Sequence, residues 1–444
     1  MNNNLLKKEI EVKPITLFFL VSISGILVSC VISLSPWAGP VDWFDMGGAA
    51  SRRFMDFYGH FGFSSKKQEL YHYATGMWGL FPPINYVIYY PMYLMSGGSP
   101  GLIPDEVLAS ANFELITNYI ENNMPVAPMT FVYYCIIISL ILYCTISDIG
   151  KKNKMVSTLL FLTLMFSAEF LWGTLQRGNA ATITVVLMLV SLHWKNSDKG
   201  WKRELALILM AFSAAMKLYP AIFGLLYLKE KRWKEAIRLT IYGLLLFFVP
   251  FAFFGGVEAM KLWFGYIKDT GNLFRIGRVN YIIGVVDTIA YYASGGTIFY
   301  GLGAISKIIS ICYLVLMLFL ALISKNRYRT MFFLCCAMTF FPVNANRYTL
   351  AYLSLPLIFF IKEDPDEKPW ITLFLFGLLF SMPGLYGIME EWIPYGIIFF
   401  GSTAMDEYLY LIAYLLCLVV VIKEIYSFIP IRKVDTNGVS SSSN

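Results

Sequence analysis

The first candidate catalytic residues are two aspartates that follow the first long apolar run. The run covers about residues 15–35, and Asp42 and Asp45 follow it within the sequence SPWAGPVDWFD. A carboxylate near a membrane surface can act as a general base toward a hydroxyl group brought to that surface. Asp42 can equally cap a short helix that begins at Trp43, because aspartate is a preferred N-cap residue. We therefore predict that Asp42 is a catalytic base or a helix cap, with Asp45 as a possible secondary acid.

Lys217 is the strongest polar signal inside an apolar run, in the sequence AAMKLYPAIF. An ammonium group at membrane depth is costly unless it faces a polar cavity or an anion. Pro220 stops the helix here, and interrupted helices commonly line binding sites in membrane proteins. The alternative is a lysine that extends from a short helix to the membrane surface. Lys217 and its neighbour Tyr219 are therefore candidates for binding an anionic group.

Several arginines are predicted to gather on the same side of the membrane as Asp42. They are Arg177, Arg275, Arg278 and Arg347. A guanidinium group grips phosphate oxygens in pairs, so such a cluster suits a phosphate ester. The alternative for each arginine is to anchor the chain among lipid headgroups. Glu169, the other candidate secondary acid, is positioned to pair with one of these arginines or with Lys217, so that neither charge is left alone.

These few charges stand in a very apolar chain. Of its 444 residues, 57% are hydrophobic and only 14% are charged, whereas soluble domains are about 45–50% apolar and about 25% charged. This composition excludes a soluble enzyme, a disordered protein and a disulfide-rich secreted domain. The net charge of +6 does not indicate nucleic acid binding, because basic residues also set membrane topology. The expected surroundings are a lipid bilayer, and no nucleic acid partner is expected.

The apolar runs predict an all-α, polytopic membrane protein with about twelve transmembrane helices. A spanning helix needs roughly 20 apolar residues, and the runs lie at about 15–35, 129–147, 155–175, 179–194, 203–218, 219–228, 235–254, 297–323, 330–344, 347–361, 370–388 and 404–423. About two thirds of the 35 lysines and arginines fall on the N-terminal side of this layout. Because positive loops stay inside, both termini are predicted to be cytoplasmic.

The layout defines one membrane domain with two large outer loops. The domain covers 15–423, between a cytoplasmic N-terminus (1–14) and a partly disordered cytoplasmic tail (424–444). The first outer loop, 36–128, is predicted to contain interfacial helices, and the second covers 255–296. Within the first loop, segment 84–97 is apolar but split by Pro91. It therefore either lies in the interface or spans the membrane with a partner.

The order of several short motifs is similar to that of a known family. An acidic residue follows the first span, and after it come Phe81-Pro82-Pro83, a Gly-Asn turn, the A-x-K-L-Y-P break at Lys217 and the basic run Lys231-Arg232-Trp233. Over about residues 15–361 the chain resembles the membrane glycosyltransferases of the C superfamily. It looks most like the bacterial branch similar to polyprenol-phosphate-mannose-dependent α-1,2-mannosyltransferases. The most specific part of this resemblance runs from Asn179 to Trp233.

The resemblance implies an inverting hexosyltransferase in a bacterial cytoplasmic membrane, with its active site on the outer face. It would move a sugar, such as mannose, from a polyprenyl-phosphate donor to an envelope glycolipid or polysaccharide. The family's base corresponds to Asp42. Its phosphate-binding residues correspond to Lys217 and Arg347. No cofactor or metal is expected, because a lipid phosphate is already a reasonable leaving group. The full set of donor-binding candidates is Lys217, Arg347, Arg177, Asn179, Tyr219, Arg275, Arg278, Asn280 and Tyr348.

The sequence departs from the family pattern at two positions, and other functions stay open. The turn reads Gln176-Arg177-Gly178-Asn179 where the family commonly has Gly-Gln-x-Asn, and Arg347 precedes Tyr348 where many members have histidine. Both changes add positive charge and leave the sugar open. The alternatives are a polysaccharide polymerase or ligase that uses lipid-diphosphate-linked glycans, and a lipid-linked sugar flippase.

Overall fold

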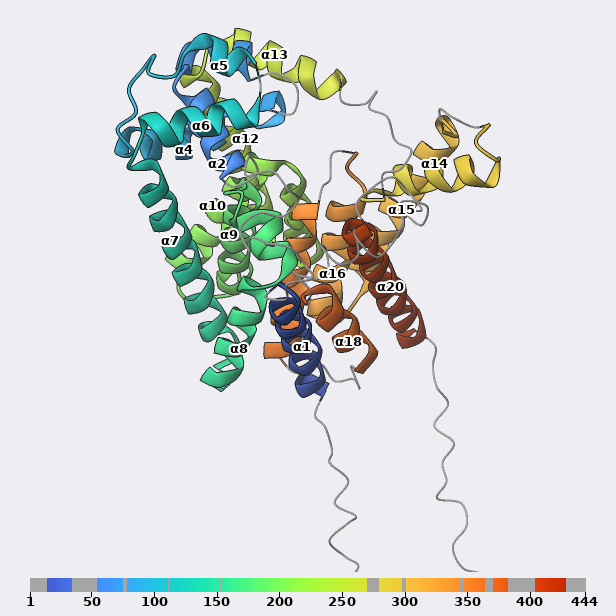
Figure 1. The fold of residues 1–444 in the computed structure, drawn as a ribbon. Helices are drawn as coiled ribbons and strands as arrows, with labels where there is room; N and C mark the ends of the chain where they lie inside the picture. Colours follow the sequence, from blue (N-terminus) through green and yellow to red (C-terminus); the bar gives the residue numbers. More distant parts are fainter. Residues whose placement is uncertain are drawn as a thin grey trace, which may run out of the picture.

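The computed structural model of the protein describes residues 14–33, 54–74, 78–110, 112–151, 153–269, 279–297, 301–343, 347–363, 370–381 and 404–428. Regular structure within these ranges is helical throughout. Figure 1 shows a bundle of roughly upright helices with shorter helices crossing over one end. Four predicted site residues lie outside the described ranges, namely Asp42, Asp45, Arg275 and Arg278.

The shorter helices form a cap, which we define as α2 to α6 with α13. Their bounds are α2 Met55–Ser64, α3 Leu70–Tyr73, α4 Pro83–Met95, α5 Asp105–Ala109, α6 Phe113–Asn123 and α13 Gly256–Asp269. All but α13 belong to the predicted first outer loop. Because α4 has 13 residues, it is about 20 Å long, too short for a hydrocarbon core of about 30 Å. Segment 84–97 packs on α2, and it is not among the described helices that are long and apolar enough to cross a membrane.

The upright helices correspond to the predicted spans. Within the described ranges, four of them are long and apolar enough to cross a membrane: 127–148, 233–253, 304–323 and 408–427. They belong to α7 (Ala127–Asp148), α12 (Trp233–Phe248, extended by η8, Val249–Phe253), α15 (Ala304–Ile323) and α20 (Ala404–Ser427). The other predicted spans contain α1 (Pro14–Ser33), α8 (Lys154–Met165), α9 (Ala180–Trp194), α10 (Gly200–Lys217), α11 (Leu225–Lys229), α16 (Arg327–Phe340), α17 (Ser354–Lys362) and α18 (Trp370–Leu379). The chain is thus a multi-pass membrane protein, but the predicted number of twelve spans is not confirmed.

Two predicted spans have wrong boundaries. The run 155–175 is not one helix, because α8 ends at Met165 and a π-helical segment, η6 (Ala168–Leu175), starts after Ser167. The Ser167 hydroxyl accepts the Phe170 N–H at 3.4 Å and so caps the new segment. The run 297–323 begins only at Ala304, since positive φ angles at Gly301 and Gly303 interrupt the backbone before it. Apolar composition alone marks neither interruption.

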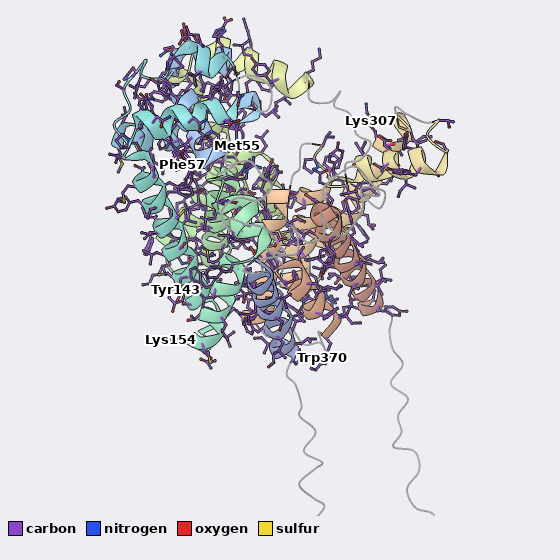
Figure 2. The ribbon with its side chains drawn as sticks, in the orientation of Figure 1. Met55, Phe57, Tyr143, Lys154, Lys307 and Trp370 are labelled. Atoms are coloured by element: carbon purple, nitrogen blue, oxygen red, sulfur yellow. The ribbon has the colours of Figure 1, made fainter. Side chains whose placement is uncertain are left out.

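The end of the bundle opposite the cap joins three of the basic loops. In Figure 2, Lys154 and Trp370 lie at this end, away from Met55 and Phe57. Arg232 donates to Asn196 at 2.8 Å, and Lys229 donates to the Ser324 carbonyl at 2.6 Å. These bonds bring together the loops 195–203, 229–234 and 324–329, three of the basic loops that the predicted layout puts on the N-terminal side.

Candidate functional site

The site is built on the junction between α2 and the turn that precedes α9. The backbone N–H groups of Asp56 and Phe57 both donate to the Arg177 carbonyl at 3.0 Å. In the same turn, Gly178 has a φ of 65°. A Cβ atom on Gly178 would lie 2.5 Å from the Phe57 Cβ, far inside normal contact distance. Glycine is therefore required for the cap to approach the bundle this closely.

Asp56 is the centre of the polar contacts at this junction. Arg177 Nε and Nη2 donate to Asp56 Oδ2 and Oδ1 at 3.0 and 3.1 Å, and Asn179 Nδ2 donates to Oδ2 at 2.7 Å. Burial by itself raises the pKa of Asp56, but the Arg177 charge and the hydrogen bonds of Arg177 and Asn179 outweigh it. The pKa of Asp56 therefore lies below its ordinary value. Asp56 is an ionised carboxylate whose two oxygens are both occupied.

Asn179 also fixes the start of the next helix. Its Oδ1 accepts the Ala181 N–H at 2.9 Å, which is the N-cap contact that asparagine commonly makes. The same side chain thus caps α9 and holds Asp56. The predicted importance of the Gly-Asn turn follows from both residues, because Gly178 permits the close approach and Asn179 connects the two elements.

Lys217 lies where α10 is interrupted, as the sequence predicts. Leu218 follows with φ 55° and ψ −52°, a conformation that side-chain-bearing residues rarely adopt. Pro220 lies in the short helix η7 (Tyr219–Gly224) that begins after this turn. The Met216 carbonyl at the end of α10 accepts a hydrogen bond from Asn85 Nδ2 of α4 at 2.9 Å. This bond ties the interrupted helix to the cap.

The Lys217 side chain is 8% exposed and lies between two aromatic rings. Its Nζ is 4.4 Å from the ring centroid of Phe81 and 4.4 Å from that of Tyr348. Within the described part of the chain, the amine makes neither a hydrogen bond nor an ion pair with a carboxylate. Ring faces attract a cation but do not neutralise it. Lys217 is therefore a nearly buried cation that is free to accept an anion.

His60 connects the Asp56 junction with the rings around Lys217. Its ring stacks on Tyr89 at 4.5 Å and meets Phe81 edge to face at 4.6 Å, while the Tyr89 hydroxyl donates to the Gly178 carbonyl at 2.9 Å. Burial lowers the pKa of His60 to about 3, and the charge of Asp56 opposes this only in part. His60 is therefore neutral near neutral pH and adds no charge beside Lys217.

The structure brings some of the predicted site residues together. Arg177 and Asn179 bind Asp56, and Tyr348 contacts Lys217. Tyr219 follows Lys217 by two residues and places its ring edge to face with that of Tyr352, at a centroid distance of 5.8 Å. These residues come from the cap, the 176–179 turn, the α10 break and η10 (Arg347–Leu353).

Other predicted residues lie apart or are not described. Glu169 is fully buried in η6, which packs against η10. The guanidinium group of Arg177 binds Asp56 rather than Glu169. The predicted pairing of Glu169 with Arg275, Arg278 or Arg347 falls on side chains outside the described part of the chain. Asn280 is buried just before α14 (Ile282–Ala293). Arg347 opens η10, but its side chain lies outside the described part.

Sequence reasoning missed Asp56 and His60. Asp56 lies 121 residues from Arg177 in the chain, and the local sequence MDFYGHFGF contains no motif that singles it out. Among the described residues, no three His, Cys, Asp or Glu side chains gather as a metal site requires. The expectation that no metal takes part remains a prediction.

Comparison with known proteins identifies a family. The model of glycosyltransferase family 87 matches residues 122–344, which is half of the chain. This range contains the 176–179 turn, α9, α10 and Lys217, but neither Asp56 nor Tyr348. Neither a curated protein nor a solved structure matches the chain.

Proposed function

The chain belongs to glycosyltransferase family 87, and on this premise we propose that it transfers a hexose, such as mannose, from a polyprenyl-phosphate donor. The acceptor would be a glycolipid or polysaccharide of the cell envelope. The reaction would take place on the outer face of a bacterial cytoplasmic membrane, with both termini in the cytoplasm. The cap and the Lys217 region would then face outward.

The observation that carries this proposal is the environment of Lys217. Among the described residues Lys217 has no carboxylate partner, and a nearly buried cation in this state is costly in a membrane protein and marks a binding site. The neighbouring Asp56–Arg177 pair is neutral as a unit, so it does not cancel the charge of Lys217. The site therefore has an excess positive charge where an anion can bind. A lipid phosphate supplies that anion at membrane depth, and the family supplies the sugar transfer.

The proposed reaction is a single displacement with inversion. Asp42 takes the proton from an acceptor hydroxyl, and that oxygen attacks the anomeric carbon of the donor sugar. The bond between the anomeric carbon and the phosphate oxygen breaks, and the lipid phosphate leaves with the electron pair. Lys217 and Arg177 would stabilise the negative charge that develops on the leaving phosphate. This proposal needs no metal or cofactor.

Asp56 is less suited than Asp42 to act as the base. Its oxygens accept three hydrogen bonds, and its pKa is held below the ordinary value. A good base needs a free lone pair and a pKa closer to the working pH. Asp56 therefore fits the role of positioning Arg177. Asp42 remains the proposed base.

The test of the phosphate site is transfer by the purified enzyme in proteoliposomes. The donors are a polyprenyl-monophosphate hexose and a lipid-diphosphate oligosaccharide, with products identified by mass spectrometry. We expect a new hexose only with the monophosphate donor. Lys217→Met should lower kcat/KM about 100-fold, the loss typical for one stabilising donor. Lys307→Met, in α15 and exposed, is the matched control and should keep normal activity.

The test of the base compares variants of Asp42 and of its sequence neighbour Asp45. Asp42→Asn should abolish transfer while donor binding is retained, and Asp45→Asn should be milder. Normal turnover by Asp42→Asn would contradict the base assignment. Transfer only from the diphosphate donor would instead identify a polymerase or ligase. Movement of labelled donor across the membrane without new glycosidic bonds would identify a flippase.

A further inference from the structure

A large apolar groove runs between α10, η7, α11 and α12. Its volume is about 670 Å³, within the range of about 300–1,000 Å³ for small-molecule sites. The wall on the α10 side is made mostly of alanines, including Ala211, Ala214 and Ala215, while Leu239 and Phe247 line the α12 side. Small residues on one wall and bulky residues on the other leave a channel between the two helices.

The groove can bind only an apolar occupant. Among the described residues that line the groove, Thr240 alone has a polar side chain. Its hydroxyl already donates to the Ala236 carbonyl at 3.0 Å. The groove thus offers no polar side-chain group to orient a sugar, a nucleotide or a peptide. A hydrocarbon chain needs no such partner, and its burial is favourable in proportion to its area.

The groove lies at the edge of the bundle. None of the described side chains of α12 is buried by the rest of the protein. The rim of the groove carries three exposed apolar side chains, Leu228, Leu244 and Phe248. In a bilayer this face contacts lipid. A lipid chain can therefore enter the groove from the side without first passing through water.

The groove extends along the last turn of α10, the helix that ends at Lys217. Ala214 and Ala215 belong to the last turn of α10, which ends at Lys217, and Leu218 lines the groove directly after it. At this turn the Lys217 side chain is nearly buried, whereas Leu218 is 42% exposed. One interrupted turn thus presents a cation on one side and an apolar channel on the other. This is the order of groups in a prenyl phosphate, which has an anionic head on an apolar chain.

We infer that the groove binds the isoprenoid chain of the donor next to its phosphate. This inference rests on the proposed function for the identity of the head group. It goes further than that function in two ways. It places the isoprenoid chain of the donor between α10 and α12, and it makes the length of that isoprenoid chain a determinant of specificity. The lipid would lie with its phosphate at Lys217 and its first isoprene units along Ala214, Ala211 and Phe247.

Photo-cross-linking tests the location without requiring turnover. The probe is undecaprenyl phosphate with a diazirine in an isoprene unit near the phosphate, added to the full-length protein in proteoliposomes. We expect labelled peptides from α10 and α12 that contain Ala214 or Phe247. Unlabelled undecaprenyl phosphate should compete, and citronellyl phosphate, whose chain is too short to fill the groove, should compete poorly. Labelling confined to the exposed faces of α7 or α15 would overturn the inference.

Filling the groove tests its role in donor use. A Cβ atom on Gly243 would meet nothing within 4 Å, so Gly243→Phe adds a side chain without displacing the backbone. The ratio of kcat/KM for an undecaprenyl-phosphate donor to that for a citronellyl-phosphate donor should fall about tenfold, the equivalent of about two buried methylene groups. Ile241→Phe, on the same helix but exposed and outside the groove, is the matched control with an unchanged ratio. An unchanged ratio in Gly243→Phe would overturn the inference.

The two experiments separate this inference from the proposed function. Groove labelling by undecaprenyl phosphate in a protein that transfers no hexose from any polyprenyl phosphate would overturn the proposed function and support the groove. Hexose transfer combined with labelling outside the groove would overturn only the inference that the groove binds the isoprenoid chain.

Discussion

Arg177 holds both carboxylate oxygens of Asp56, with Nε 3.0 Å from Oδ2 and Nη2 3.1 Å from Oδ1. The pair connects α2 of the cap with the turn before α9, and the backbone bonds to the Arg177 carbonyl reinforce the connection. Because the pair is neutral as a unit, it brings a guanidinium group toward Lys217 without adding net charge. The cap is thus attached to the bundle at the point where the anion site lies.

Removing the charge of Asp56 should destabilise the protein. Asp56→Asn leaves a largely buried guanidinium group without its carboxylate partner. Because Arg177 is about one third exposed, we expect the free energy of unfolding to fall by about 2 kcal/mol, which lies between the losses for exposed and for buried ion pairs. Thermal unfolding in detergent measures it. Asp105→Asn, which removes the Lys66 pair at an exposed carboxylate, should change the melting temperature little. If Asp56→Asn and Arg177→Met were additive in the double variant, the two side chains would not be coupled.

Adding one methyl group to the turn should be more damaging than its size indicates. Gly178→Ala combines a positive φ with a clash against the Phe57 Cβ, so α2 must move away from the turn. We expect a loss of about 2–3 kcal/mol in unfolding free energy, together with reduced transfer. The control is Gly265→Ala, a helical position where a Cβ meets nothing within 4 Å. It should be neutral or slightly stabilising. Equal melting temperatures for the two variants would show that the cap does not depend on this contact.

The sequence predicts the helices of this protein better than it predicts the contacts between them. Apolar runs locate α7, α9 and α10 within a few residues, because a membrane helix is specified by its own composition. The break at Lys217 is also predictable, since a lysine and a proline within an apolar run act locally. The π-helical segment after Ser167 is not, because its apolar composition does not distinguish it from an α-helix.

The candidate site shows the same division. Lys217 and the Gly178–Asn179 turn stand out locally because of charge in an apolar run and because of turn chemistry. Asp56 does not stand out, because its importance comes only from meeting Arg177 in space. The same holds for His60, which is one of 3 histidines and gains its role from its contacts with the rings of Tyr89 and Phe81. A local sequence pattern does not show which distant residue a side chain will contact in the folded protein.

His60 should make the protein sensitive to acid. Its pKa in the folded protein is about 3, whereas an unfolded histidine titrates near 6.5. Above about pH 6.5 both states are neutral at this residue and the fold has its full stability. As the pH falls toward 3, only the unfolded state gains the proton, so stability falls by up to about 1.4 kcal/mol per pH unit. Melting temperatures between about pH 7 and pH 5 measure this slope.

Replacement of His60 isolates this effect from other titrations. His60→Phe keeps the ring stack on Tyr89 and removes the proton site, so its melting temperature should fall less steeply with acid. His72→Phe, at an exposed position, should keep the wild-type slope. Asp56 acts in the same direction at lower pH, because its stabilising charge is lost as the pH falls through its lowered pKa. An identical slope in wild type and His60→Phe would contradict the assignment of a neutral, buried His60.

The ring of Tyr348 should matter for donor binding through Lys217. The ring centroid is 4.4 Å from Lys217 Nζ, and a desolvated cation–ring contact contributes about 1–2 kcal/mol. Tyr348→Leu should therefore weaken binding of undecaprenyl phosphate roughly 5- to 30-fold, whereas Tyr348→Phe keeps the ring and should bind almost normally. Titration of the purified protein in proteoliposomes measures both dissociation constants. If the two variants lost affinity equally, the hydroxyl of Tyr348 would be the group that acts, and the ring contact would only hold Lys217 in place.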